Sequence, residues 1–197
     1  MHHSRILNRP ACPAWLFAGF ITLLAAASGL AADTVNGNLL LQVKGELNVY
    51  HNGRKISLRD KADADQHFRV KVPEKTFAAG DVIVLHVHSP YVYRAISAAI
   101  DLEKKGGQIP VKKQHWRIIT KPVDPRKITA TMLQASLENP DLAKPDGNGE
   151  TERAKLGMIS ADANGSDWVK TPRQLNSWYC IGFVLTQEML ATKLPVK

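Results

Sequence analysis

His86 and His88 are the residues whose type and spacing point most directly to a chemical function. Residues two apart on a β-strand share a face, so both imidazoles are expected on one side of a sheet. Two such imidazoles are within reach of one Cu(II) or Zn(II) ion. The pair predicts half of a metal site, with His51, His67 or His115 as the third ligand. We favour the simpler interpretation that both histidines lie on the polar face of a half-buried strand, because no third ligand is fixed in sequence.

Cys180 does not extend this pair into a blue-copper site. Such a site needs a histidine close behind the cysteine, and Cys180 is followed by Met189 but by no histidine. Its apolar surroundings predict a buried, inert thiol. The sequence contains no nucleophile elbow, zinc-hydrolase helix, phosphate loop or haem-attachment motif. A non-catalytic function is therefore favoured, and an uncharacterised hydrolase is the last alternative.

The N-terminal region has the features of a secretory signal peptide in the required order. Arg5 and Arg9 occur without acidic residues, and an apolar stretch follows from Ala14 to Leu30. Small residues at its end predict cleavage after Ala31 and hence a periplasmic or secreted protein. A retained anchor is the alternative, because a bilayer span needs about 17 to 25 apolar residues and this stretch is near the lower limit.

Charge and cysteine content limit the partners of the processed chain. Cleavage would leave 166 residues with 24 basic and 18 acidic side chains, a formal charge of +6, and a single cysteine that cannot close an internal disulfide. Such a chain is expected to meet an unknown protein or an anionic component of the cell envelope. No nucleic acid is expected outside the cytoplasm, and no membrane span is expected after cleavage.

The elements that position the histidines are predicted to be strands. Apolar and polar residues alternate from Leu41 to Tyr50, with Gln42 on the polar face, and Asn52-Gly53 is a strong hairpin signal. Pro73 is expected to end a later strand, and the turn at Gly80 leads into the most apolar strand of the chain. Strands are predicted over residues 41–50, 55–59, 68–72, 82–88 and 108–120.

Three helices are predicted from a shared start signal. Ser89, Asp124 and Thr171 each precede a proline, a combination that favours the first turn of a helix. The helices are predicted over residues 91–102, 125–137 and 172–190, and a strand is the alternative for the first. In the second helix, three residues are expected to point inward: Ile128, Met132 and Leu133.

Short strands separated by turns favour an antiparallel β-sandwich with added α-helices, chiefly in the C-terminal third. The stretch from Leu47 to His88 resembles exported immunoglobulin-like, fibronectin-like and cupredoxin-like modules in its architecture. The predicted organisation is a signal peptide (1–31), a β-sandwich-like domain with a helical insert (32–138), a linker or surface loop (139–152) and a helical C-terminal extension (153–197).

These features together predict an exported, non-catalytic binding or accessory module. The alternative is a periplasmic copper- or zinc-handling protein that uses His86 and His88. Apart from these two metals, no cofactor is predicted.

Overall fold

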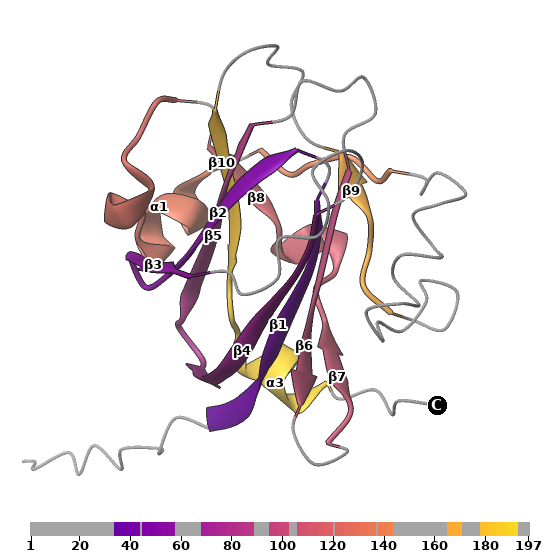
Figure 1. The fold of residues 1–197 in the computed structure, drawn as a ribbon. Coiled ribbons are helices and arrows are strands. Elements are labelled where there is room, and N and C mark those ends of the chain that lie inside the picture. The colour runs from indigo at the N-terminus through magenta and orange to yellow at the C-terminus, as the bar shows by residue number, and fades with distance from the viewer. Residues whose placement is uncertain are drawn as a thin grey trace, which may run out of the picture. The chain divides into compact units, whose positions relative to one another are not determined.

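The computed structural model of the chain is mainly β, with two sheets of antiparallel strands and few helices (Figure 1). It describes residues 34–43, 45–57, 68–88, 95–102, 106–119, 121–136, 138–143, 165–170 and 178–192, with residues 68–75 as backbone. The predicted signal peptide, His67 and most of the predicted linker lie outside these ranges.

Each sheet has five strands in this part of the chain, and all strand pairs are antiparallel. Sheet A has the order β4 (Phe68–Ala78), β1 (Thr34–Val43), β6 (Ala95–Leu102) and β7 (Gln108–Pro110), and β9 (Val169–Lys170) also pairs with β6. Sheet B has the order β3 (Arg54–Ile56), β2 (Glu46–His51), β5 (Val82–His88), β10 (Tyr179–Val184) and β8 (Arg117–Ile119). The helical elements are η1 (Lys113–His115), η2 (Pro125–Lys127), α1 (Ala130–Ala135) and α3 (Gln187–Ala191). None of these is long and apolar enough to cross a membrane.

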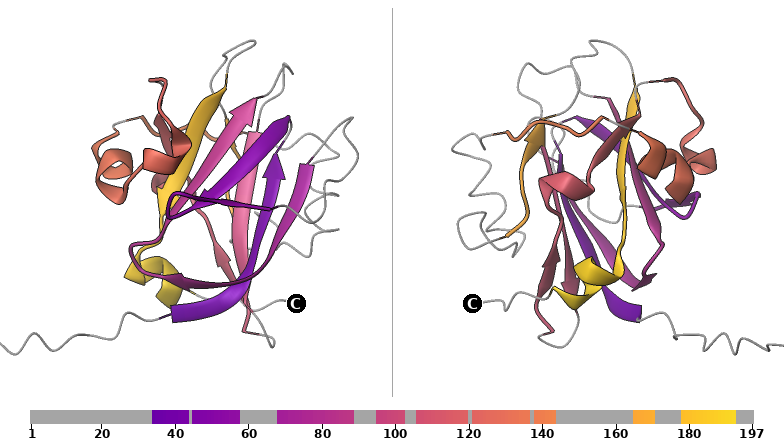
Figure 2. Two further views of the ribbon diagram at one scale, coloured as in Figure 1. Left: turned by 60° about the vertical axis from the view of Figure 1, so that its left-hand side comes forward. Right: turned by 180° about the vertical axis from the view of Figure 1, so that it is seen from behind.

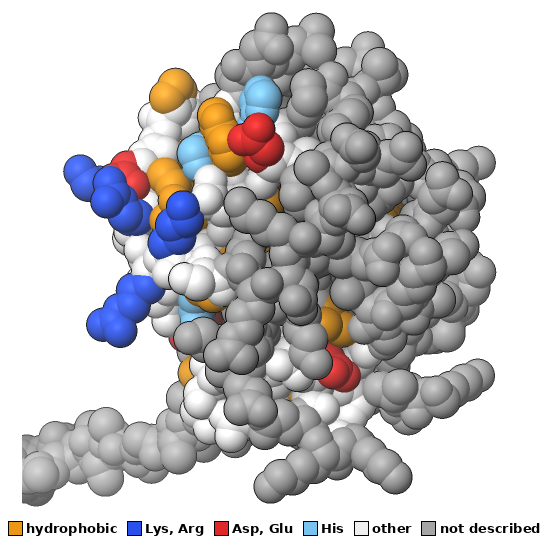
Figure 3. Space-filling view, in the orientation of Figure 1, with side chains coloured by type: hydrophobic (Ala, Val, Ile, Leu, Met, Phe, Trp, Pro, Cys, Tyr) orange, Lys and Arg blue, Asp and Glu red, His pale blue; other side chains and the backbone are white. Residues whose placement is uncertain are grey.

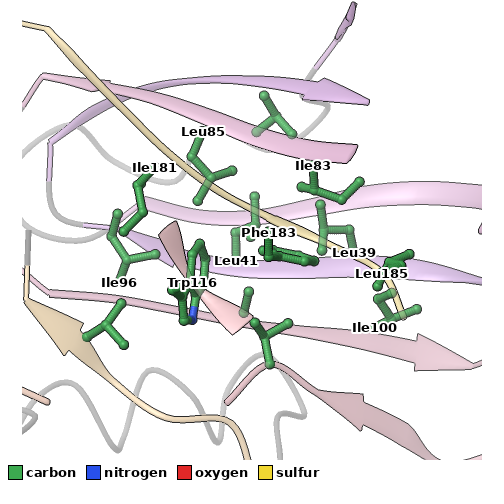
Figure 4. Close-up of a cluster of buried hydrophobic side chains, with 14 of the residues drawn as sticks. Leu39, Leu41, Ile83, Leu85, Ile96, Ile100, Trp116, Ile181, Phe183 and Leu185 are labelled. Carbon is green, nitrogen blue, oxygen red and sulfur yellow. The ribbon is translucent and has the colours of Figure 1, made fainter. Parts of the chain in front are cut away.

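One hydrophobic core takes side chains from both sheets. Leu39 and Ile100 from sheet A and Ile83 and Phe183 from sheet B are all buried in it. Figure 4 shows residues of both sheets together with Trp116 in this core. The Trp116 and Phe183 rings pack edge to face with centroids 5.0 Å apart, an arrangement that the charge distribution of aromatic rings favours. The two sheets are therefore held together by a shared apolar interior.

The strand predicted over residues 41–50 is in fact two strands in different sheets. β1 ends at Val43 in sheet A, and β2 begins at Glu46 in sheet B. Between them Gly45 has a φ of 128°, which residues with a Cβ rarely adopt. The glycine lets the chain turn from one sheet to the other. Gln42, expected on a polar face, is fully buried.

The hairpin predicted at Asn52-Gly53 is confirmed. These residues have φ values of 49° and 75°, and a type I′ turn requires positive φ at both of its central positions. The pairing of His51 with Arg54 closes the hairpin between β2 and β3. The turn at Gly80 is also confirmed, with a φ of 94°, and β5 occupies its predicted residues.

β4 begins where predicted but does not end at Pro73. It continues for another five residues, to Ala78. The register against β1 shifts opposite Pro73, between Val72 and Lys75. Proline lacks the N–H donor that a regular ladder uses, and a bulge tolerates this loss. The prediction was wrong because it treated proline as a strand terminator.

The helix prediction was wrong for residues 95–102, which form β6, so the strand alternative is correct there. β6 pairs with β1, β7 and β9, and all its residues except Asp101 are buried. A short strand that is buried on both faces has no polar alternation, and its apolar run resembles that of a buried helix. Periodicity therefore could not distinguish the two.

The strand predicted over residues 108–120 is interrupted. β7 belongs to sheet A and β8 to sheet B, and η1 lies between them. The backbone N–H of Lys113 donates to Oδ2 of Asp167 at 2.7 Å. A backbone donor in this crossing is thus paired with a side chain far along the chain, which a local pattern cannot show.

The helix predicted over residues 125–137 forms two short pieces. Asp124 caps η2, and the Thr129 side chain caps α1 by accepting from the N–H of Met132. Ile128 and Leu133 are buried, as predicted. Met132 is 40% exposed, so its predicted inward orientation was wrong. The break at Thr129 changes which helical face meets the sheet.

The helix predicted over residues 172–190 was wrong for Tyr179–Val184, which form β10 between β5 and β8. Apolar β-branched and aromatic residues favour a strand here. Gly182 allows close packing, because a Cβ at this position would lie 2.4 Å from the carbonyl oxygen of Ile83. Only α3 is helical at this end of the described chain. The C-terminal third therefore supplies an inner strand of sheet B.

Candidate functional site

β5 places His86 and His88 on the outer face of sheet B, as their spacing predicts. Ile83, Leu85 and Val87 are fully buried in the core. Because side chains alternate along a strand, the two histidines point away from that core. Both are half-buried, so their surroundings on the outer face decide what they can do.

Trp178 packs against both imidazoles. Its ring centroid lies 4.6 Å from that of His86, with 36° between the ring planes, and 5.5 Å from that of His88, with 28°. Trp178 directly precedes β10, in which Tyr179 lies opposite Val87, so the register brings the indole beside the histidines. Trp178 remains 39% exposed. Sequence reasoning assigned this residue to a helix and missed the contact.

Two polar residues of β2 lie on the same surface. Glu46 lies opposite His88, and Asn48 lies opposite His86. Directly opposed residues on antiparallel strands share a face. We call Glu46, Asn48, His86, His88 and Trp178 the histidine face. Figure 3 shows histidine, hydrophobic and acidic side chains together on the visible surface, with Lys and Arg side chains beside them.

The neighbouring half of this sheet face is covered by the segment that contains α1. Tyr50 and Cys180 of sheet B form a buried cluster with Ile128 and Leu133. Figure 2 shows α1 on the outer side of β10. Burial, with a smaller effect of Asp124, raises the pKa of the Cys180 thiol to about 11. The thiol stays protonated at neutral pH and is inert, as its apolar surroundings predict.

Burial lowers the pKa of His86 below its usual value. The positive charge of Lys55 acts in the same direction, and the negative charge of Asp124 acts against both. His86 is therefore neutral at neutral pH, the form whose free ring nitrogen can accept a hydrogen bond or bind a metal. Lys55 lies opposite Tyr50 on the outermost described strand of sheet B. It places a positive charge within electrostatic range of the histidine face.

His51 belongs to a different cluster. Its Nε2 lies 2.9 Å from Oδ2 of Asp81, and its ring centroid lies 5.4 Å from that of Phe77. Asp81 also accepts from Nδ2 of Asn52 at 2.7 Å and from the backbone N–H of Ala78 at 2.8 Å. These contacts tie the β2–β3 hairpin to the turn between β4 and β5. We call His51, Asn52, Ala78 and Asp81 the turn cluster.

His115 lies in η1, where it lines a hollow with Glu188 and Met189 of α3. Among the described residues, no group of three His, Cys, Asp or Glu side chains could hold a metal ion. The structure thus brings His86 and His88 together but brings neither His51 nor His115 to them. His67, the other predicted third ligand, lies outside the described residues.

The histidine face combines an exposed indole, two imidazoles, an amide and a carboxylate. These groups can stack on a ligand, exchange hydrogen bonds with it or coordinate a metal through imidazole. Comparison of the chain with protein families, curated proteins and solved structures finds no match. The function is therefore inferred from the groups that the histidine face presents.

Proposed function

We propose that the chain is an exported, non-catalytic binding or accessory module that contacts its ligand or partner through the histidine face. The observation that carries this proposal is Trp178, which stays 39% exposed while it packs on His86 and His88. Tryptophan is enriched among the residues that dominate binding energy at interfaces. Packing on two imidazoles restricts the indole before any ligand arrives, which reduces the conformational entropy lost on binding.

An anionic component of the cell envelope is the partner class that we propose for this surface. The processed chain would carry a formal charge of +6, and Lys55 lies close enough to His86 to shift its pKa. The exposed side chain of Lys127 lies in η2, which contacts β5. Glu46 adds a negative charge beside His88. An anionic group is therefore expected to bind on the Lys55 side of Trp178.

The binding test uses sedimentation of the purified protein with vesicles of phosphatidylglycerol and phosphatidylcholine, with peptidoglycan sacculi, and with phosphatidylcholine vesicles as the uncharged control. Trp178→Ala and Lys55→Gln should each weaken binding to the anionic material, Trp178→Ala at least tenfold. Met132→Ala is the matched control, because Met132 is 40% exposed outside the histidine face. Equal binding by wild type and Trp178→Ala, or equal losses in Trp178→Ala and Met132→Ala, would refute the proposed surface.

The export and the finer fold are proposals that accompany this function. Two antiparallel sheets around one core support a β-sandwich of immunoglobulin-like, fibronectin-like or cupredoxin-like architecture. The order of basic leader, apolar stretch and small residues supports cleavage after Ala31. N-terminal sequencing of the expressed protein should give a first residue at Ala32 or within one or two residues of it. Retention of Met1 in the membrane fraction would instead identify the apolar stretch as an anchor.

Copper or zinc handling through His86 and His88 is the second candidate. It is favoured by the shared face of the two imidazoles and by the burial that keeps His86 neutral. Calorimetric titration with Cu(II) and Zn(II) should show that His86→Ala and His88→Ala each remove most of the binding. The affinity should weaken in acid as the His86 imidazole, whose pKa lies below its ordinary value, protonates and loses its free ring nitrogen. His51→Ala is the control, and equal effects of all three variants would exclude this site.

A further inference from the structure

A second surface feature lies away from the histidine face, between η1 and α3. It is a hollow of about 220 Å³ that shares no residue with that face. Pro110 and the 3% exposed Met189 contribute apolar lining, and His115, Glu188 and Lys112 contribute polar groups. Pockets for drug-sized ligands span roughly 300–1,000 Å³, so this hollow fits a smaller molecule.

The charges around the hollow are not equally available. Lys112 donates from Nζ to the carbonyl oxygen of Gly165, and the same ammonium lies 3.9 Å from Oδ1 of Asp167. Its positive charge thus already has a partner. Glu188 makes no ion pair with Lys or Arg in the described part of the chain. Among the described residues, the hollow therefore presents one exposed carboxylate without a cationic partner.

His115 is the neighbour that defines the chemistry beside this carboxylate. Burial lowers its pKa; Glu188 and Asp167 act to raise it, and Arg117 acts to lower it. The imidazole is thus neutral at neutral pH and offers one ring nitrogen as a hydrogen-bond acceptor. A carboxylate and a neutral acceptor next to apolar side chains suit a ligand with a cationic N–H head and a short apolar body.

We propose that this hollow binds a small primary amine in its ammonium form, with the head between Glu188 and His115 and the alkyl chain on Met189 and Pro110. A carboxylate ligand would be repelled by Glu188. An alcohol of the same length could donate a hydrogen bond to the carboxylate, but it carries no positive charge and would lose the attraction between opposite charges. The proposal does not depend on the function of the histidine face.

The direct test is a ¹⁵N-resolved NMR titration of the purified chain with n-butylammonium, with butyrate and 1-butanol as probes of similar size. Butylammonium should shift the amide signals of Gln114, His115 and Met189 saturably, with at least tenfold higher affinity than the other two probes. Glu188→Gln should weaken butylammonium binding at least tenfold. Asp141→Asn removes an exposed carboxylate outside the hollow and the histidine face, and it should leave the affinity unchanged.

The pH dependence separates this site from general attraction of cations. As pH falls through the pKa of His115, which lies below 6.5, the imidazole gains a positive charge and competes with the ligand for Glu188. Lys112, Arg117, Asp167 and Glu188 are the other charged groups around this imidazole. The affinity of His115→Gln for butylammonium should therefore not fall as the pH is lowered through this range. Equal shifts by butyrate and butylammonium, unchanged butylammonium affinity in Glu188→Gln, or an equal loss of affinity in Asp141→Asn would each overturn the proposal.

Discussion

Replacing Asp81 with alanine is expected to lower the free energy of unfolding by about 2.5–5 kcal/mol. The carboxylate is 14% exposed and accepts three hydrogen bonds, from His51, Asn52 and Ala78. Its removal leaves two part-buried donors at a cost of about 1–2 kcal/mol each, and one exposed donor at about 0.5–1 kcal/mol. For a chain of this size the melting temperature should fall by about 5–20 °C.

The same carboxylate should make stability depend on pH in acid. Burial alone would raise the pKa of Asp81, but hydrogen bonds from Asn52, Ala78 and His51 outweigh it and lower the pKa. The folded state therefore binds the proton less readily than the unfolded state. The contribution of Asp81 is complete above the unfolded pKa of about 3.9, and it is lost as pH falls through the lower folded pKa. Asp81→Ala should lack this part of the acid destabilisation.

Urea unfolding, followed by circular dichroism from neutral pH to about pH 3, measures both effects. His51→Ala removes one of the three hydrogen bonds and should lose less stability than Asp81→Ala. Asp81→Asn keeps the shape of the side chain but not its charge, so its free energy of unfolding should lie between those of wild type and Asp81→Ala. The reasoning fails if the free energies of unfolding of Asp81→Ala and wild type agree within about 0.5 kcal/mol. It also fails if the two proteins lose stability in parallel as the pH is lowered.

Two further predictions concern single positions in the sheets. Gly182→Ala should lower the free energy of unfolding by about 3 kcal/mol or more, because the new Cβ would lie 2.4 Å from the carbonyl oxygen of Ile83, which is fixed in a strand. Gly80 has a φ of +94° but nothing within 4 Å of an added Cβ, so Gly80→Ala should lose less stability in the same urea unfolding experiment. Gln42→Met should raise the free energy of unfolding by about 1–3 kcal/mol, since the buried Gln42 amide has no hydrogen-bond partner among the described residues. Ser97→Ala is the companion variant, because it removes a hydroxyl opposite Gln42 that is likewise unpaired among these residues. A lower free energy of unfolding in Gln42→Met would show that the amide has a partner.

Local chemistry predicted the parts of the fold that depend on only a few neighbouring residues. Asn52-Gly53 specifies its hairpin because both residues tolerate positive φ. Asp124 starts a helical turn because its side chain accepts from a nearby backbone N–H. The shared face of His86 and His88 follows from the period of two along one strand. None of these features requires knowledge of a distant segment.

Several of the mispredicted elements are buried on both faces or cross between the sheets. In β6 and β10 nearly every residue is buried, so polar alternation is lost and helix and strand patterns become indistinguishable. The passage from β1 to β2 depends on the positive φ of Gly45, whose meaning is clear only once two sheets exist. The position of Glu46, Asn48 and Trp178 beside the histidines was missed for a related reason, because it depends on pairing registers between distant strands.

The histidine face and the core are set by one register. Tyr179 lies opposite Val87, and both side chains are buried between the sheets. The same pairing brings Trp178 to His86 and His88 on the opposite face. A one-residue slip of β10 would move Tyr179 out of the core and turn Trp178 inward, since alternate residues exchange faces. Core packing therefore fixes the position of the exposed indole, and a ligand that binds it meets a surface held in place by folding.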